Sequence, residues 1–153
     1  MTIYPLDTVF DFSSEDGHPP SKIVGVDHYQ CEAEDGSHQT WASYTLVPTN
    51  PEDQKGDYER WYLIDMPPPF EMTVCHLIEP FEFRDDFEKA LNISGKVSVS
   101  SDGNAELGTG TGQLDCYVDK SAQPPTIYAK EVFDGGEPLY FRVVPLKIAP
   151  NVK

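Results

Sequence analysis

Cysteine and histidine are the residues of this chain best suited to nucleophilic chemistry. Cys75 and His76 are adjacent, and a thiolate beside an imidazole is the arrangement of a cysteine nucleophile. Neighbouring residues of a strand point to opposite faces, however, so these two side chains would not meet. His28 and Cys31 lie three residues apart in another strand-like segment. Their side chains would also point to opposite faces and would not meet. The sequence therefore predicts no catalytic residue, and we expect a protein that is not an enzyme.

The cysteines themselves are expected to be structural. Cys31, Cys75 and Cys116 leave one thiol unpaired in any disulfide scheme, and none lies in a C-x-x-C spacing. A small thiol beside apolar residues behaves as a core residue in a reducing compartment. The N-terminal segment carries aspartates and no basic region, which is not typical of a secretory signal. These features favour a cytoplasmic protein with three buried thiols.

Metal ligands are present in the sequence but are not arranged as a site. Segment 27–38 is rich in Asp, Glu, His and Cys without a ligand spacing of a known metal site. Segment 102–108 begins like a calcium loop, yet Leu107 stands where that loop requires glycine. The glycines of 108–112 lack the lysine of a phosphate-binding loop. We therefore predict no metal and no cofactor.

Charge is the strongest property of the composition. The chain has 26 acidic and 11 basic residues, for a formal charge of −15. Binding to nucleic acid or to an anionic membrane requires the opposite sign, so we expect neither as a direct partner. A basic protein surface is the expected partner, reached through acidic loops that would converge on one edge. These acidic residues are Glu32, Glu34, Asp35, Glu52, Asp53, Asp57 and Glu59.

Strand patterns position these residues. In the first half, segments 22–33, 40–47 and 58–66 are dense in β-formers, and the turn at Asp35-Gly36 and a polar loop at 48–57 join them as a meander. In segment 40–47, Trp41 and Ser43 share one face, and Tyr44 and Leu46 share the other. A second set of strands is predicted in 72–83, 95–107, 112–119, 126–133 and 139–148.

The predicted fold is all-β and mainly antiparallel. Two meanders of three to four strands would share one core, as a sandwich or a partly open barrel. One short helix is expected near 84–92, because Phe87 and Leu91 lie one helical turn apart behind Asp85 and Asp86. Residues 1–153 form a single domain with two possible sub-halves, 1–66 and 70–153, divided where Pro67–Pro69 ends a strand.

The first half resembles a bacterial family of small all-β domains of unassigned function. Members of this family have a W-x-x-Y-x-L strand, then a second strand with a tryptophan, and later a Tyr-x-x-Glu strand. The matching residues here are Trp41, Tyr44, Leu46, Trp61, Leu63, Tyr128 and Glu131. The resemblance covers about a third of the chain. It implies an all-β fold and transfers no active-site residue.

Three functions are compatible with these patterns. The first is a non-enzymatic acidic protein that docks a basic surface of a protein partner. The second is a nucleic-acid mimic that inhibits a nucleic-acid-binding protein, as a phage counter-defence protein would. The third is a β-barrel that binds a small ligand, or an enzyme, with a pocket of aromatic residues. That pocket would be lined by Trp41, Tyr44, Trp61 and Tyr62.

Overall fold

The computed structural model describes residues 4–12, 18–56, 59–66, 72–84, 86–105, 109–123, 125–146 and 151–152. The first strands are β1 (Val9–Asp11), β2 (Ser21–Ala33), β3 (His38–Pro48), β4 (Trp61–Asp65), β5 (Met72–Ile78) and β6 (Glu88–Lys89). They are followed by β7 (Gly95–Gly103), β8 (Gly110–Asp119), β9 (Thr126–Phe133), β10 (Leu139–Pro145) and β11 (Asn151–Val152). Among the described residues, the 3-10 turns η1 (Pro51–Asp53) and η3 (Pro80–Glu82) lie between strands.

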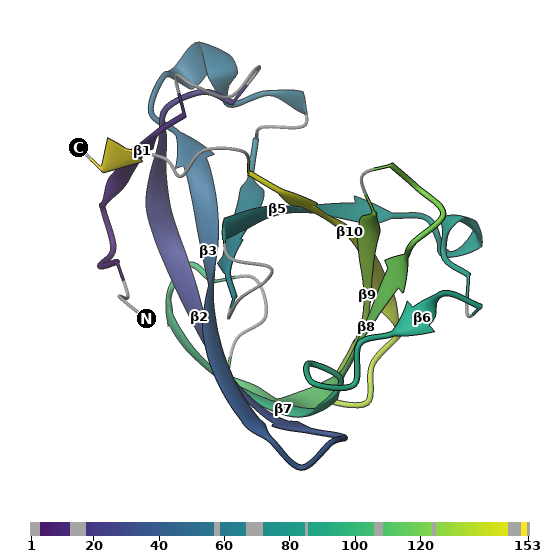
Figure 1. Ribbon diagram of the computed structural model, residues 1–153. Helices are drawn as coiled ribbons and strands as arrows, with labels where there is room; N and C mark the ends of the chain where they lie inside the picture. The colour runs from purple at the N-terminus through teal and green to yellow at the C-terminus, as the bar shows by residue number, and fades with distance from the viewer. Residues whose placement is uncertain are drawn as a thin grey trace.

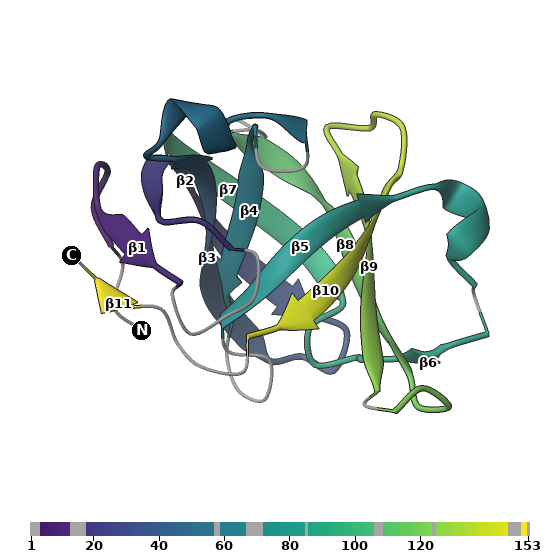
Figure 2. The ribbon, with the colours of Figure 1, turned by 90° about the horizontal axis from the view of Figure 1, so that it is seen from above.

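Eight of these strands close into an antiparallel barrel. Their order is β2-β3-β4-β5-β10-β9-β8, and β7 pairs with both β8 and β2 to complete the ring. Figure 1 shows the barrel end-on, with the view down its axis, and Figure 2 shows it from the side. Closure pairs both edges of each barrel strand, so that the barrel itself has no open edge. The long β2 carries much of this closure, because it pairs with β3 on one side and with β7 on the other.

Residues with positive φ turn the chain between neighbouring strands. Gly36 has a φ of 88° in the β2–β3 turn, which confirms the turn predicted at Asp35-Gly36. Asp134 and Gly135 have φ values of 50° and 70° in the β9–β10 turn, as a tight hairpin requires. These turns set the register that decides which side chains point into the barrel.

In the part of the chain that the structure describes, three short strands lie outside the ring. β1 pairs with β2 and with β11, and β6 pairs with β8. On the outer face of β2–β5, residues from β1 and from the barrel wall form a second hydrophobic cluster, the outer core. The outer core consists of Phe10, Phe12, Ile23, Val26, Ala42, Tyr44, Leu46, Trp61, Leu63 and Val74. Part of the barrel wall therefore has buried residues on both faces.

The prediction of an all-β antiparallel fold is confirmed, but the sandwich or partly open barrel is wrong. One closed sheet replaces two packed meanders, because β7 pairs with β2 from the first half of the chain and with β8 from the second half. β4 ends at Asp65, where a strand was expected to end. The proline run 67–69 lies outside the described residues. β4 and β5 pair on either side of it, with Asp65 opposite Met72, so the sheet continues from one proposed sub-half into the other.

The short helix predicted near 84–92 is also wrong. This segment contains β6, and Asp85 lies outside the described residues. Phe87 stacks on Tyr128 with ring centroids 4.9 Å apart, and Leu91 is half exposed. A helix of this length is marginal on its own, so pairing with β8 and contacts with aromatic residues decide the conformation. Among the described residues, no helix has the length and apolar character needed to span a membrane.

Candidate functional site

The barrel encloses a cavity of about 330 Å³. Its lining follows the two-residue period of the strands: odd-numbered residues of β2, β3, β5, β9 and β10 point inward, as do even-numbered residues of β4 and β8. The strands contribute Asp27, Tyr29, Trp41, Ser43, Tyr62, Ile64, Cys75, Leu77, Leu114, Cys116, Ile127, Ala129, Glu131, Leu139, Phe141 and Val143, and the connections contribute Met66 and Ile93. The lining is therefore mainly apolar and aromatic, with a few polar groups.

The structure divides the four predicted pocket aromatics into two pairs. Trp41 and Tyr62 line the cavity. Tyr44 and Trp61 point to the other face of the wall and belong to the outer core. This split follows from the alternation within β3 and from the pairing of β3 with β4. Inside the cavity, Trp41 stacks on Tyr29, with ring centroids 5.1 Å apart and planes inclined by 10°.

Two buried carboxyl groups face the cavity. Asp27 on β2 is 2% exposed and Glu131 on β9 is 7% exposed. The Tyr29 hydroxyl donates to Glu131 Oε1 over 3.3 Å, and the Ser101 hydroxyl donates to Asp27 Oδ1. Burial, together with the nearby charge of Asp27, raises the pKa of Glu131 to about 7 in spite of the tyrosine hydrogen bond. Burial and the same two acids hold the pKa of Tyr29 well above its ordinary value.

Glu131 was not identified as a site residue from the sequence, where it appeared only in the family resemblance. Its position in the alternation of the strand could have identified it, because Glu131 lies on the same strand face as Ile127 and Ala129. Asp27 is likewise in phase with Tyr29 and Cys31. Acidic residues usually lie on the face of a strand that contacts solvent. An acidic residue on the apolar face therefore indicates a buried carboxyl group.

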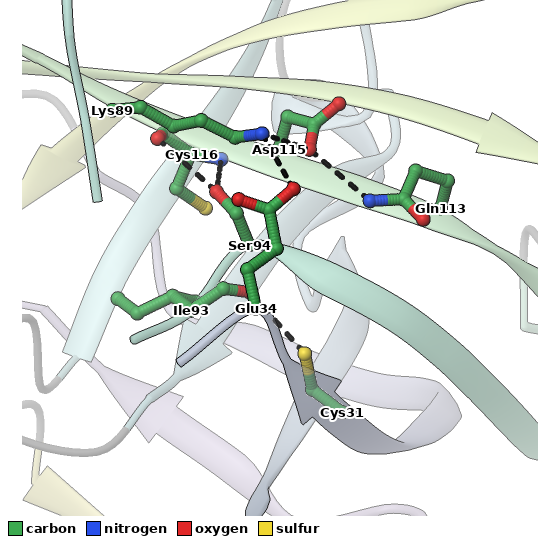
Figure 3. Close-up of polar contacts among 8 residues, drawn as sticks. All are labelled: Cys31, Glu34, Lys89, Ile93, Ser94, Gln113, Asp115 and Cys116. Carbon is green, nitrogen blue, oxygen red and sulfur yellow. Dashed lines mark hydrogen bonds and ion pairs between the residues drawn. The ribbon is translucent and has the colours of Figure 1, made fainter. Parts of the chain in front are cut away.

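The segment that follows β6 is attached to one end of the barrel by polar contacts, which Figure 3 shows. The Ile93 side chain lines the cavity, and its carbonyl accepts a hydrogen bond from Cys31 Sγ over 3.3 Å. The Cys116 amide donates to Ser94 Oγ over 2.8 Å. Lys89 Nζ lies 2.6 Å from Glu34 Oε1 and 3.3 Å from Asp115 Oδ1. These contacts attach β6 and the segment that follows it to β8 and to the end of β2.

Exposed lining residues mark the other end as the entrance. Leu77 on β5 and Leu139 on β10 line the cavity although they are 65% and 40% exposed. Glu131 is the register partner of Leu139, so this carboxyl group lies near the entrance. Phe141 is the register partner of Leu77, so a ligand that entered between these leucines would meet a carboxyl group and an aromatic ring.

The three cysteines are buried and free, as predicted. Burial is the main cause that raises the pKa of each thiol, to about 11 for Cys31, to about 12 for Cys116 and well above the ordinary value for Cys75. A thiol that stays protonated is a poor nucleophile and a poor metal ligand. Cys75 faces the cavity whereas the adjacent His76 is exposed, as expected for neighbours in a strand.

The structure does not bring the predicted acidic loops together. Glu32, Glu34 and Asp35 lie at the β2–β3 turn, and Glu52, Asp53 and Glu59 lie in the β3–β4 connection at the opposite end of β3 (Figure 1). These residues are exposed, and Asp57 lies outside the described residues. Glu34 pairs with Lys89, and the Asp35 carboxylate accepts hydrogen bonds from Ser37. The two acidic groups thus form separate surfaces.

The fold and the cavity define an antiparallel barrel with a mainly apolar interior site. Among the residues that the structure describes, no group of three or more His, Cys, Asp or Glu side chains is arranged to hold a metal ion. Comparisons with protein-family models, with curated proteins and with solved structures find no match to this chain. The resemblance of the first half to a bacterial all-β family stays a prediction.

Proposed function

We propose that this protein binds a small, mainly apolar molecule inside its barrel. The observation that supports the proposal is the cavity of about 330 Å³, because ligand sites in proteins are typically clefts of about 300–1,000 Å³ lined by apolar and aromatic residues with a few polar groups. A bound ligand would supply the packing contacts that the apolar lining of an unfilled cavity lacks.

Two features argue against a cysteine nucleophile in the cavity. The cavity thiols, Cys75 and Cys116, are held protonated by burial, and adjacent strand geometry keeps His76 away from Cys75. The polar groups that remain are suited to orienting a ligand. A protein that carries or senses a small molecule requires only a cavity that binds the molecule and polar groups that orient it. The barrel that binds a small ligand was the third of the functions derived from the sequence.

An acidic surface that docks a basic protein, and a nucleic-acid mimic, stay predictions. The formal charge of −15 supports both. The separation of the acidic groups to opposite ends of β3 means that a partner would have to contact one group or the other.

A cavity-filling substitution tests the proposed function. Ala129 is buried in the cavity wall, and Ala129→Leu would add three carbon atoms to the space that a ligand would occupy. A neutral probe such as 2-phenylethanol should shift the resonances of Trp41 and of the cavity methyl groups in the wild-type protein. We expect the Leu variant to bind the probe at least about tenfold more weakly, a loss of about 1.4 kcal/mol.

Ala122→Leu is the matched control. Ala122 lies in the β8–β9 turn, outside the cavity lining, so this variant should bind the probe as the wild type does. Circular dichroism and a thermal melt would verify that both variants fold. Equal affinity of the wild type and the folded Ala129→Leu variant would contradict a binding site inside the barrel.

A further inference from the structure

The charged groups of the cavity all have the same sign. Asp27 and Glu131 line it, and the described lining residues include no lysine, arginine or histidine. Both carboxyl groups are more than nine-tenths buried, where a charge interacts far more strongly than at the surface because the local dielectric is low. The interior therefore favours a positively charged ligand and repels an anion.

Glu131 can accept a hydrogen bond from a ligand. Its Oε1 accepts the Tyr29 hydroxyl over 3.3 Å, and a carboxylate has two oxygens that accept hydrogen bonds. A ligand with an N–H donor, entering between Leu77 and Leu139, would reach this carboxylate.

Aromatic faces complete the site. The stacked rings of Tyr29 and Trp41, together with Tyr62 and Phe141, line the same cavity as the two carboxyl groups. Aromatic faces attract cations, with tryptophan the strongest. We infer that the ligand is a small organic amine, with its ammonium group at Glu131 and Asp27 and its apolar body against Tyr29 and Trp41. This inference rests on the proposed function and specifies its ligand.

The size of the cavity limits the ligand. A cavity of about 330 Å³ lies near the lower end of the range for small-ligand sites, about 300–1,000 Å³, and suits a compact molecule. An arylalkylamine has this size. A peptide or a lipid tail of ordinary length would exceed it.

Three probes of nearly equal size test the inference: 2-phenylethylamine, 2-phenylethanol and phenylacetate, which are cationic, neutral and anionic at pH 7.5. Their affinities would be measured by calorimetry, and their site by chemical shifts of the cavity residues. We expect the amine to bind at least about tenfold more tightly than the alcohol, and the carboxylate to bind most weakly. Glu131→Gln should reduce the preference for the amine over the alcohol by at least about fivefold, whereas Glu137→Gln, at an exposed position of the next turn, should leave it unchanged.

Release of a proton when the amine binds is a measurement that distinguishes a binding role of Glu131 from a purely structural one. The titratable groups that interact with Glu131 are Asp27 and Tyr29 on β2, Cys75 on β5 and Cys116 on β8, and none of them is a lysine, arginine or histidine. An ammonium group should favour the carboxylate, so that the proton of Glu131 leaves to solvent as the amine binds. Near the pKa of about 7, calorimetry in buffers of different ionisation enthalpy should show release of about half a proton per amine, and none with Glu131→Gln.

The outcomes separate the two proposals. If the alcohol or the carboxylate binds at the cavity as tightly as the amine, the assignment of an amine is overturned while the barrel remains a binding site. If none of the three probes shifts a cavity resonance in the wild-type protein, the proposed function fails and the ligand assignment fails with it. The comparison within the wild type decides this even if the Glu131→Gln variant does not fold.

Discussion

Ionisation of Glu131 should make the stability of this protein depend on pH in a way that one substitution isolates. The ordinary pKa of a glutamate here is 4.5, and burial raises it to about 7 in the folded protein. Since a tenfold change in proton affinity corresponds to about 1.4 kcal/mol, the ionised side chain destabilises the folded state by about 3 kcal/mol. That is a large fraction of the stability of a typical domain.

The direction of the effect follows from proton binding in the two states. Below about pH 4.5 Glu131 is protonated in both the folded and the unfolded chain, so the folded protein has its full stability. Between pH 4.5 and about 7 the unfolded chain loses its proton first, and stability falls as pH rises. Above that range both states are ionised, and the loss stays constant at about 3 kcal/mol.

Glu131→Gln removes the ionisation and keeps an oxygen that can accept the Tyr29 hydroxyl. Urea unfolding followed by tryptophan fluorescence, repeated from pH 4.5 to 8.5, would give the free energy of unfolding of both proteins. We expect nearly equal values at pH 4.5 and a variant that is more stable by about 3 kcal/mol at pH 8. Glu137→Gln corrects for the loss of one surface charge. A difference between variant and wild type that stays constant over this pH range would refute the reasoning.

Three further outcomes are expected. Because burial keeps its thiol protonated, Cys75 should resist a thiol reagent in the folded protein and react once urea unfolds it, and rapid labelling of the folded protein would contradict this. Ser94→Ala should lower the free energy of unfolding by about 1–3 kcal/mol, because it leaves the buried Cys116 amide without its acceptor; Ser98→Ala, at an exposed position of β7, should change little. Trp61→Ala should cost about 3–5 kcal/mol by truncating the outer core, yet the folded variant should bind cavity probes as the wild type does, and a loss of affinity would place Trp61 in the site.

The strands were predictable because their patterns are local. The alternation in segment 40–47 placed Trp41 and Tyr44 on opposite faces, and the structure shows them in the cavity and in the outer core. The buried thiols followed from their apolar neighbours. The helix predicted near 84–92 was wrong because it relied on the helical spacing of Phe87 and Leu91. Phe87 instead stacks on Tyr128, which is distant in the sequence. Contacts between distant segments override weak local propensity.

Closure of the barrel, and with it the cavity, was not predictable. It depends on the pairing of β2 with β7, in which Tyr29 lies opposite Val99, and a single sequence contains no signal for so distant a pair. Without closure, neither face of β3 is identifiable as the interior. The division of the four predicted aromatics and the separation of the acidic loops both follow from this topology.

Intermolecular nuclear Overhauser effects would test the central claim most directly. With 2-phenylethylamine bound to protein labelled at its methyl groups, cross-peaks should connect the ligand ring to Ile64, Ile127 and Val143, which line the cavity on β4, β9 and β10. Cross-peaks to Leu46 or Leu63 of the outer core, or to surface methyl groups alone, would place the ligand outside the barrel and contradict the account.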